Sequence, residues 1–293
     1  MNFRSTYALD KFGRNYELEV ETPTGGLLTI RPPFSLQFDI TRNALTSANI
    51  CQLRIYNLNE LNRSRIRFNI SDYGTFRGVK LKAGYGKNLA EVFSGNISQA
   101  WSQREKTDFI TTIECYDGGF AFVNGITSKQ FGKGTSQKDI IKDLGSSMPG
   151  VSLGAVGDFE GVTKRSNSYD GPTMEILGGL TGGAAFIDNG KFHALLANEY
   201  IESDKTVVIN ADTGLLATPV LEQTIVRFSM IFEPSLAVGS RIKLESQTEK
   251  NFNGFYKTVA VKHRGIISDA VAGNLETTGE FFYSKILTGV RED

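Results

Sequence analysis

Few residues in this sequence have the types and spacing that catalysis or metal binding requires. The two histidines, His193 and His263, are seventy residues apart and lack a metal-binding frame, so we expect both to be ordinary strand residues. The two cysteines, Cys51 and Cys115, exclude a disulfide-dense scaffold and a four-cysteine zinc site. We expect them to be neighbouring buried thiols in a reducing cytosol, with a disulfide as the alternative.

The glycine-rich segments do not have the spacing of nucleotide-binding motifs. Gly132-Lys133-Gly134-Thr135 places a glycine after the lysine, where a phosphate-binding loop needs Ser or Thr, and Thr127 stands where its first glycine should be. We interpret this segment as a loop that leads into a helix. The segment Gly178–Gly183 (GGLTGG) follows an expected helix rather than a strand, so it is not a dinucleotide fingerprint.

Other signatures of enzymes and binding proteins are also missing from the sequence. There is no G-x-S-x-G nucleophile motif, and the carboxylates are scattered without a pair that spacing would assign to acid–base catalysis. Trp101 is the single tryptophan, so an aromatic ladder for single-stranded nucleic acid is excluded. We therefore expect no enzyme, no catalytic residue, no metal and no cofactor.

Charge and hydropathy narrow the class of protein further. The 32 basic and 32 acidic residues give a formal net charge of zero, which argues against a protein that coats nucleic acid. No stretch reaches the length of apolar residues that a membrane span needs, so no membrane partner is expected. The 40% hydrophobic content is ordinary for a globular protein of 293 residues.

Most of the chain alternates apolar and polar residues, as half-buried strands do. Short alternating runs separated by glycine-rich turns are typical of a β-barrel or sandwich. The runs that carry this prediction are 51–56, 79–83, 107–116, 225–231, 241–245 and 255–261.

The middle of the chain has a different pattern. Ser136 begins a capping-box-like helix start, and Gly145 stands where a helix-ending glycine would. A second helix is expected to begin at Pro172 and to end at Gly178-Gly179. Asn189-Gly190 predicts a tight hairpin turn, and the stretch 150–171 is expected to be a long loop with weak strands.

A faint internal repeat links the two ends of the chain. LRIYN, GVKLKAGYG and a strand ending at Tyr116 correspond to FSMIFEP, GSRIKLES and a strand ending near Phe282, with Phe93-Ser94-Gly95 matched to Phe252-Asn253-Gly254. The first copy has an extra helix-like segment, 59–69. We predict a mainly β fold with a small α+β insert. Two related β-barrel domains, 1–125 and 206–293, flank a helix-plus-hairpin domain, 126–205.

This order of elements resembles the baseplate hub protein of contractile, myovirus-type phage tails, a family related to the hub part of type VI secretion spikes and to tailocin hubs. The resemblance spans nearly the whole chain, from about Tyr16 to Tyr283. It implies a homotrimeric ring with two barrels per chain, which joins a sixfold tail tube to a threefold central spike and surrounds the channel for DNA ejection. The implied location is the virion tail baseplate, assembled in the host cytoplasm.

The resemblance also implies partners and leaves alternatives. The partners are further copies of the chain, the tail tube or a tube-initiator ring, the spike and, as another candidate, the tape measure protein, while DNA passes without specific binding. One alternative is another ring-forming tail protein, such as a tube initiator or distal tail component. The other is a β-rich carbohydrate- or receptor-binding module at a tail tip. An enzyme such as a peptidoglycan hydrolase is disfavoured, because the sequence has no set of residues whose spacing suits such catalysis.

Overall fold

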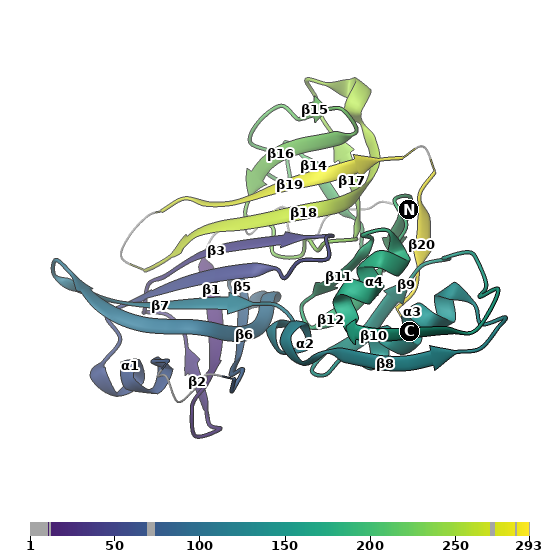
Figure 1. Ribbon diagram of the computed structural model, residues 1–293. Helices are drawn as coiled ribbons and strands as arrows, with labels where there is room; N and C mark the ends of the chain where they lie inside the picture. The colour runs from purple at the N-terminus through teal and green to yellow at the C-terminus, as the bar shows by residue number, and fades with distance from the viewer. Residues whose placement is uncertain (1–10, 12, 69–73, 270–272, 285, 293) are drawn as a thin grey trace.

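The computed structural model describes residues 11, 13–68, 74–269, 273–284 and 286–292. Two β units lie edge to edge, and a smaller module of helices and short strands lies beside them (Figure 1). The predicted mainly β fold with a small α+β insert is confirmed. Residues 1–10 of the first predicted domain, and Asn69 of the predicted helix-like segment, lie outside the described residues.

The first β unit contains seven strands in antiparallel order β2-β1-β5-β6-β7-β4-β3. Leu18, Phe38, Leu53 and Phe93 are among its buried residues, because every second side chain of an alternating strand faces the core. The strands are β1 (Arg14–Glu21), β2 (Leu27–Ile30), β3 (Leu36–Asn43), β4 (Ile50–Tyr56), β5 (Gly78–Tyr85), β6 (Asn88–Glu105) and β7 (Asp108–Tyr116).

The extra segment of the first unit forms helix α1 (Glu60–Ile66) between β4 and β5. The side chain of Asn59 caps this helix by accepting a hydrogen bond from the backbone N–H of Asn62. Ile66 is the helix residue that is buried in the core of the first unit.

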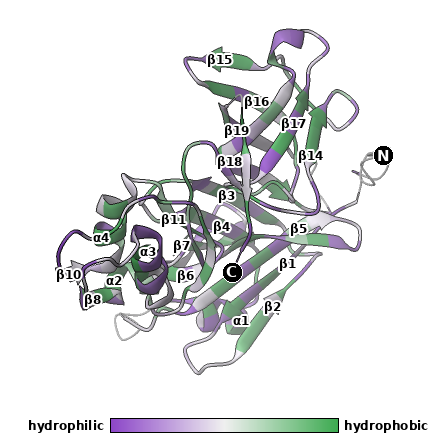
Figure 2. Ribbon diagram, turned by 90° about the vertical axis from the view of Figure 1, so that its right-hand side faces the viewer, coloured by the Kyte–Doolittle hydropathy of each residue, from purple (hydrophilic) through white to green (hydrophobic). Residues whose placement is uncertain are grey.

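The second β unit repeats the strand order of the first. The order β17-β18-β19-β16-β15 matches β5-β6-β7-β4-β3, and all corresponding pairs are antiparallel. Along the strands, apolar and polar residues alternate (Figure 2). The strands are β14 (Val207–Asn210), β15 (Val220–Glu222), β16 (Ile225–Ile231), β17 (Arg241–Glu245), β18 (Gly254–Ile267) and β19 (Leu275–Tyr283).

The pairing register corrects the predicted alignment of the two copies. The bulge of β6 between Ile97 and Gln99 matches the bulge of β18 between Thr258 and Ala260, which makes Leu244 of β17 the counterpart of Leu81 of β5. Leu81 lies opposite Phe93, whereas Leu244 lies opposite Gly254. Gly254 therefore corresponds to Phe93, and the match of Phe93-Ser94-Gly95 to Phe252-Asn253-Gly254 is wrong by two residues. The similar residues led to a shifted alignment because a two-residue shift in a strand keeps each side chain on the same face of the sheet.

The two β units share one continuous sheet. β3 pairs with β18 over eight register positions, from Asn43 opposite Ala260 to Leu36 opposite Ile267. One edge of β18 pairs first with β17 and then, beyond a bulge between Thr258 and Ala260, with β3. The strand pairing that forms this junction was not predicted from the sequence.

The middle module combines short helices with three small sheets. β8 pairs with β10, β9 and β11 flank β12, and β13 pairs with β20 from the end of the chain. Its elements are α2 (Gly119–Asn124), β8 (Ile126–Phe131), α3 (Gln137–Ser146), β9 (Ser152–Val156), β10 (Asn167–Pro172), α4 (Thr173–Thr181), β11 (Ala185–Asp188), β12 (Lys191–Ala194), β13 (Glu199–Ile201) and β20 (Thr288–Val290).

The predicted start of α3 and the predicted hairpin are confirmed. The hydroxyl of Ser136 accepts from the N–H of Asp139 at 3.1 Å, as an N-cap side chain does. Asn189 and Gly190 both have positive φ, 50° and 71°, in the two-residue turn between β11 and β12.

Two predicted helix ends are wrong. Gly145 lies inside α3, where a Cβ would come within 2.4 Å of the Phe192 ring, so this glycine allows close packing rather than ending the helix. α4 continues through Gly178 and Gly179 and ends at Gly182, which adopts the left-handed conformation. Pro172 is the N-cap of α4.

Buried residues form three clusters, and the division into domains 1–125, 126–205 and 206–293 stays a prediction. The first cluster lies mainly in the first β unit but includes Phe232, Ile267 and Leu275 from the last third of the chain. The second lies mainly in the second β unit, and the third mainly in the middle module. The stretch 150–171, expected to be a long loop with weak strands, contains β9 and most of β10. Within the described residues, none of the helices is long and apolar enough to cross a membrane.

Candidate functional site

The continuous sheet has one face that carries mostly polar side chains. Residues directly opposite each other on neighbouring strands point to the same face, so the pairing register assigns each residue to a face. We define the polar sheet face by four such rows across β16, β19, β18, β3, β4, β7 and β6. Its polar and aromatic members are Gln37, Asp39, Thr41, Asn43, Gln52, Arg54, Asn96, Gln99, Trp101, Thr112, Glu114, Tyr116, Arg227, Ser229, Lys262, Arg264, Glu276, Thr278 and Glu280.

The opposite face of the same strands is core. One row runs from Met230 through Thr277, His263, Ile40, Cys51 and Cys115 to Ile97, and all seven side chains are buried. The junction between β3 and β18 lies within this row, so the buried face also continues from one β unit to the other. The polar sheet face is therefore the open side of a single, two-sided sheet.

The charges on the polar sheet face balance. The face carries four positive side chains and four negative ones. The positive ones are Arg54, Arg227, Lys262 and Arg264, and the negative ones are Asp39, Glu114, Glu276 and Glu280. Arg227 Nε lies 2.8 Å from Glu280 Oε1, and this hydrogen bond and charge raise the pKa of Arg227. Arg54 lies 2.9 Å from Glu105 at the end of β6.

The junction itself carries one cluster of charges on this face. Asp39 of β3 lies 3.1 Å from Lys262 Nζ and 3.6 Å from Arg264 Nε of β18. Solvent-accessible pairs of this kind stabilise a fold by only about 0–1 kcal/mol each. The pairs therefore leave this part of the surface without a strong electrostatic potential of either sign, and they add little to the stability of the junction.

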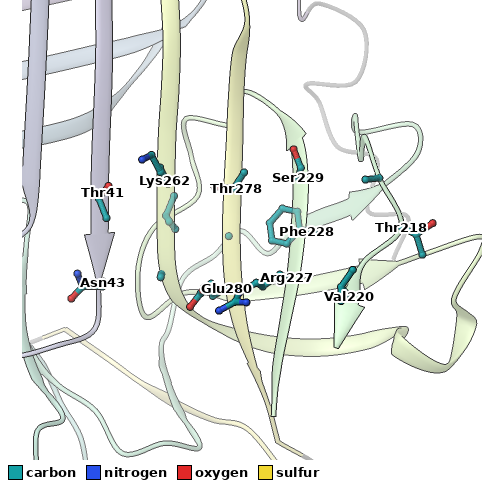
Figure 3. Close-up of a pocket in the computed structure, with 14 residues that line it drawn as sticks. Thr41, Asn43, Thr218, Val220, Arg227, Phe228, Ser229, Lys262, Thr278 and Glu280 are labelled. Carbon is teal, nitrogen blue, oxygen red and sulfur yellow. Dashed lines mark hydrogen bonds and ion pairs between the residues drawn. The ribbon is translucent and has the colours of Figure 1, made fainter. Parts of the chain in front are cut away.

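A hollow of about 550 Å³ lies on the polar sheet face of the second β unit. Arg227, Ser229 and Thr278 point into it from β16 and β19, and Thr218 and Val220 lie at its border (Figure 3). The ionised groups that line it, Arg227, Lys262 and Glu280, already have partners within the sheet.

The two histidines lie in separate parts of the core. His193 of β12 stacks on Phe186, and its Nδ1 accepts from the N–H of Ala155 at 3.0 Å. His263 of β18 contacts the hydroxyl of Thr277 at 2.9 Å through Nδ1. Burial lowers both pKa values, that of His263 to about 3, so both rings are neutral at physiological pH.

The two cysteines are direct neighbours. Cys51 of β4 lies opposite Cys115 of β7, and both are buried free thiols. Burial raises the pKa of Cys51, and the adjacent Cys115 raises it further. Such thiols are poor nucleophiles and poor metal ligands.

Two backbone donors of the glycine-rich loop 132–135 bind Thr163 within the chain. The N–H of Gly134 donates to the carbonyl of Thr163 at 2.8 Å, and the N–H of Thr135 donates to the hydroxyl of Thr163 at 3.0 Å. Gly178–Gly183 belongs to the end of α4 and its cap. Trp101 lies half-buried on β6, in the outermost row of the polar sheet face.

A buried polar cluster joins the middle module to the first β unit. Arg42 of β3 donates to Asp188 at the end of β11, with Nε to Oδ1 at 2.7 Å and Nη2 to Oδ2 at 2.5 Å. Asn49 donates to the carbonyl of Ile187 at 2.8 Å. Arg42 is only 2% exposed, and the nearby carboxylates outweigh burial and raise its pKa.

The hairpin turn of the module enters the same cluster. The N–H groups of Asn189 and Gly190 donate to the Asp117 carboxyl at 2.5 and 2.9 Å. Asn189 Oδ1 accepts from the N–H of Ser94 on β6 at 3.0 Å. The turn was predicted from the sequence but the cluster was not, because no local pattern connects Arg42 and Asp117 with residues 188–190.

The described part of the chain contains no group of three or more His, Cys, Asp or Glu side chains placed to hold a metal ion. The buried cluster around Arg42 holds the middle module against the first β unit through its ion pair and hydrogen bonds. The candidate functional surface is the polar sheet face, which carries charged side chains on the open side of the sheet.

Comparison with solved structures identifies the fold. A 43 kDa tail protein of prophage MuSo2 from Shewanella oneidensis has a TM-score of 0.59 at 8% identity, with 92% of this chain and 96% of that chain covered. A tail protein from Neisseria meningitidis MC58 has a TM-score of 0.58 at 10% identity, with 94% and 98% covered. An Escherichia coli component of the type VI secretion system, described as structurally similar to the T4 tail proteins gp27 and gp5, has a TM-score of 0.56 at 10% identity, with 88% and 76% covered.

Comparison of sequences gives the family. No curated protein matches the chain. A family model described as Baseplate hub gp41 matches residues 18–265, which run from within β1 to within β18 and leave β19 and β20 outside the match. The resemblance to baseplate hubs that the sequence suggested is confirmed, and the chain belongs to the Baseplate hub gp41 family of phage tail proteins.

Proposed function

We propose that three copies of this chain close a hub ring at the end of a phage tail tube. Each copy supplies two β units, so a trimer presents six similar units to a sixfold tube and keeps threefold symmetry for a central spike. The observation that carries the proposal is the shared strand order of β3–β7 and β15–β19, because a symmetry adaptor needs two related units in each chain.

The polar sheet face is the proposed wall of the channel for DNA ejection. Four positive and four negative side chains in its rows support this role, since a wall with excess Lys and Arg would bind phosphates and retain the DNA. Balanced charge lets the duplex pass without specific binding. In this proposal the chain is structural and has no catalytic activity, metal or cofactor of its own.

The proposed partners are the tail tube or a tube-initiator ring on one side, the spike on the other and the tape measure protein in the channel. The type VI secretion component and a Francisella PdpA–VgrG complex support a spike partner; the latter matches with a TM-score of 0.53 at 10% identity, over 94% of this chain and 53% of that chain. The proposed site of assembly is the host cytoplasm, and the proposed final location is the tail baseplate of the virion.

The mass of the native particle tests the ring. Size-exclusion chromatography with light scattering, on the purified chain and on hub complexes released from tails, is expected to give three times the 32.2 kDa chain mass. A stable hexamer would instead favour a tube initiator or distal tail ring. A monomer in both preparations would favour the carbohydrate- or receptor-binding module and would refute the hub ring.

A further inference from the structure

The two β units meet within the chain through an edge-to-edge strand contact. β18 offers the half of its edge that lies beyond the bulge, and β3 covers it over eight register positions. At its centre Ile40 lies opposite His263, and both side chains are fully buried. This contact shows how a first unit and a second unit fit together.

The internal repeat assigns a counterpart to each strand of that contact. Cys51, Cys115 and Ile97 form a row that matches Val226, Phe281 and Thr258. A bulge follows at the same place in both long strands, between Ile97 and Gln99 and between Thr258 and Ala260. β15 is therefore the counterpart of β3, and β6 is the counterpart of β18.

These counterparts are not paired with each other within the chain. β15 ends the described strand order and pairs with β16 alone, so its outer edge has no described strand beside it. β6 pairs with β5 only up to Asn96. The N–H of Phe68 then donates to the carbonyl of Ala100 on the same edge of β6 at 2.9 Å. No described strand covers the rest of this β6 edge, Trp101–Glu105. An uncovered edge with apolar residues invites pairing with another chain.

Burial differs sharply between equivalent positions. Leu221 of β15 corresponds to Ile40 and is 45% exposed, whereas Ile40 is 0% exposed. Ser102 of β6 corresponds to His263 and is exposed, whereas His263 is fully buried. The two open edges thus have the strands of the internal contact but lack the partner that buries them.

We propose that β15 of one copy pairs antiparallel with the free half of the β6 edge in the next copy, with Leu221 opposite Ser102. The contact repeats the β3–β18 junction between chains and continues the sheet around the ring. It rests on the proposed hub ring and names the surface through which its copies join.

The length of the two edges agrees with this pairing. Phe68, which follows α1, is hydrogen-bonded to Ala100 of β6. Ala100 is the counterpart of Val261 in β18, which lies opposite Arg42 of β3 in the internal junction. Phe68 therefore takes the place that Arg42 has in that junction. The β6 edge that remains, Trp101–Glu105, is short, and β15 has only three residues, against eight in β3. The contact between chains is therefore a shortened form of the contact within the chain.

Paired cysteines test the register. The double variant Leu221→Cys with Ser102→Cys, mildly oxidised, is expected to give a covalent trimer on a non-reducing gel, because directly opposite strand residues have Cα atoms within disulfide reach. The matched control is Leu221→Cys with Arg104→Cys, which moves the second thiol two residues along the same edge and is expected to remain monomeric on the gel. The native Cys51 and Cys115 are buried and do not compete.

The outcomes separate this pairing from the ring itself. A particle of trimeric mass whose Leu221→Cys, Ser102→Cys double variant gives no covalent trimer, or equal cross-linking in the control, overturns the pairing and leaves the ring intact. A monomeric mass in the purified chain and in hub complexes overturns both. As a second measure, Leu221→Lys is expected to shift the trimer to monomer, whereas Leu27→Lys, at the exposed edge strand β2, leaves the mass unchanged.

Discussion

The Asp117 carboxyl, which holds the hairpin turn of the middle module, makes the stability of the protein depend on pH. Burial and, to a smaller extent, the charge of Asp188 raise the pKa of Asp117 from 3.8 to about 7, although the N–H donors of Gly190 and Asn189 and the charge of Arg42 oppose the shift. The folded chain therefore binds a proton between pH 4 and pH 7 that the unfolded chain has lost. Stability from this group is complete below the unfolded pKa of 3.8 and is lost as the pH rises through 7.

The size of the effect follows from the two pKa values. One pKa unit corresponds to about 1.4 kcal/mol, so Asp117 is expected to contribute a fall of about 3 kcal/mol in the free energy of unfolding between pH 5 and pH 8. The buried His193 and His263 contribute in the opposite direction, because their pKa values are lowered in the folded chain. Asp117→Asn removes the titrating carboxyl, so its free energy of unfolding is expected to change between pH 5 and pH 8 without the fall of about 3 kcal/mol that Asp117 contributes. It also loses one acceptor for a buried N–H, which costs about 1–3 kcal/mol at pH 5.

Urea unfolding at pH 5 and pH 8 measures the difference, and hydrogen exchange of the peptide that contains Asn189 and Gly190 reports the turn directly. The control is Asp212→Asn, at an exposed carboxylate in the turn after β14. It should keep the pH dependence of the wild type. The same change in stability between pH 5 and pH 8 in Asp117→Asn as in the wild type would refute the reasoning.

Three further predictions concern packing, thiols and charge. Gly145→Ala places a methyl group against the Phe192 ring and is expected to destabilise the protein by about 1–3 kcal/mol in thermal unfolding, with partial rescue by Phe192→Leu. Cys51 and Cys115 are expected to react with a thiol reagent such as DTNB only after denaturation, and a fast reaction of the native protein would contradict their burial. Glu280→Lys is expected to make binding of duplex DNA detectable and strongly salt-dependent in a mobility-shift assay, whereas Glu280→Gln gives a weaker effect.

The strands were the most predictable part of the fold. The residues of β16 and β17 alternate in polarity, and their predicted and observed bounds agree at 225–231 and 241–245. This agreement arises because one face of each strand is buried and the other is not, so the burial pattern is written locally into the sequence. The same holds for the Asn189-Gly190 turn, whose positive φ angles select these residues.

The contacts between distant segments were not predictable. The β3–β18 junction joins residues more than 200 positions apart, and the ion pair of Arg42 with Asp188 joins two modules; neither leaves a local pattern. Gly145 shows the same limit, because the local sequence around a glycine near a helix end does not tell whether the glycine ends the helix or makes room for an aromatic ring from a distant strand. The alternation of polar and apolar residues along each strand of the polar sheet face could be predicted. The alignment of strands from two β units into one polar surface could not.

The strand pairing between β3 and β18 also sets the order of events during synthesis. The core of the first β unit includes Phe232, Ile267 and Leu275, which are made long after β3. At a translation rate of about 5–20 residues per second, β3 waits roughly 10–40 seconds for its partner strand. The nascent first unit thus passes through a stage with an open edge and an incomplete core, which is the stage at which a chaperone would be needed and at which copies translated side by side could pair wrongly.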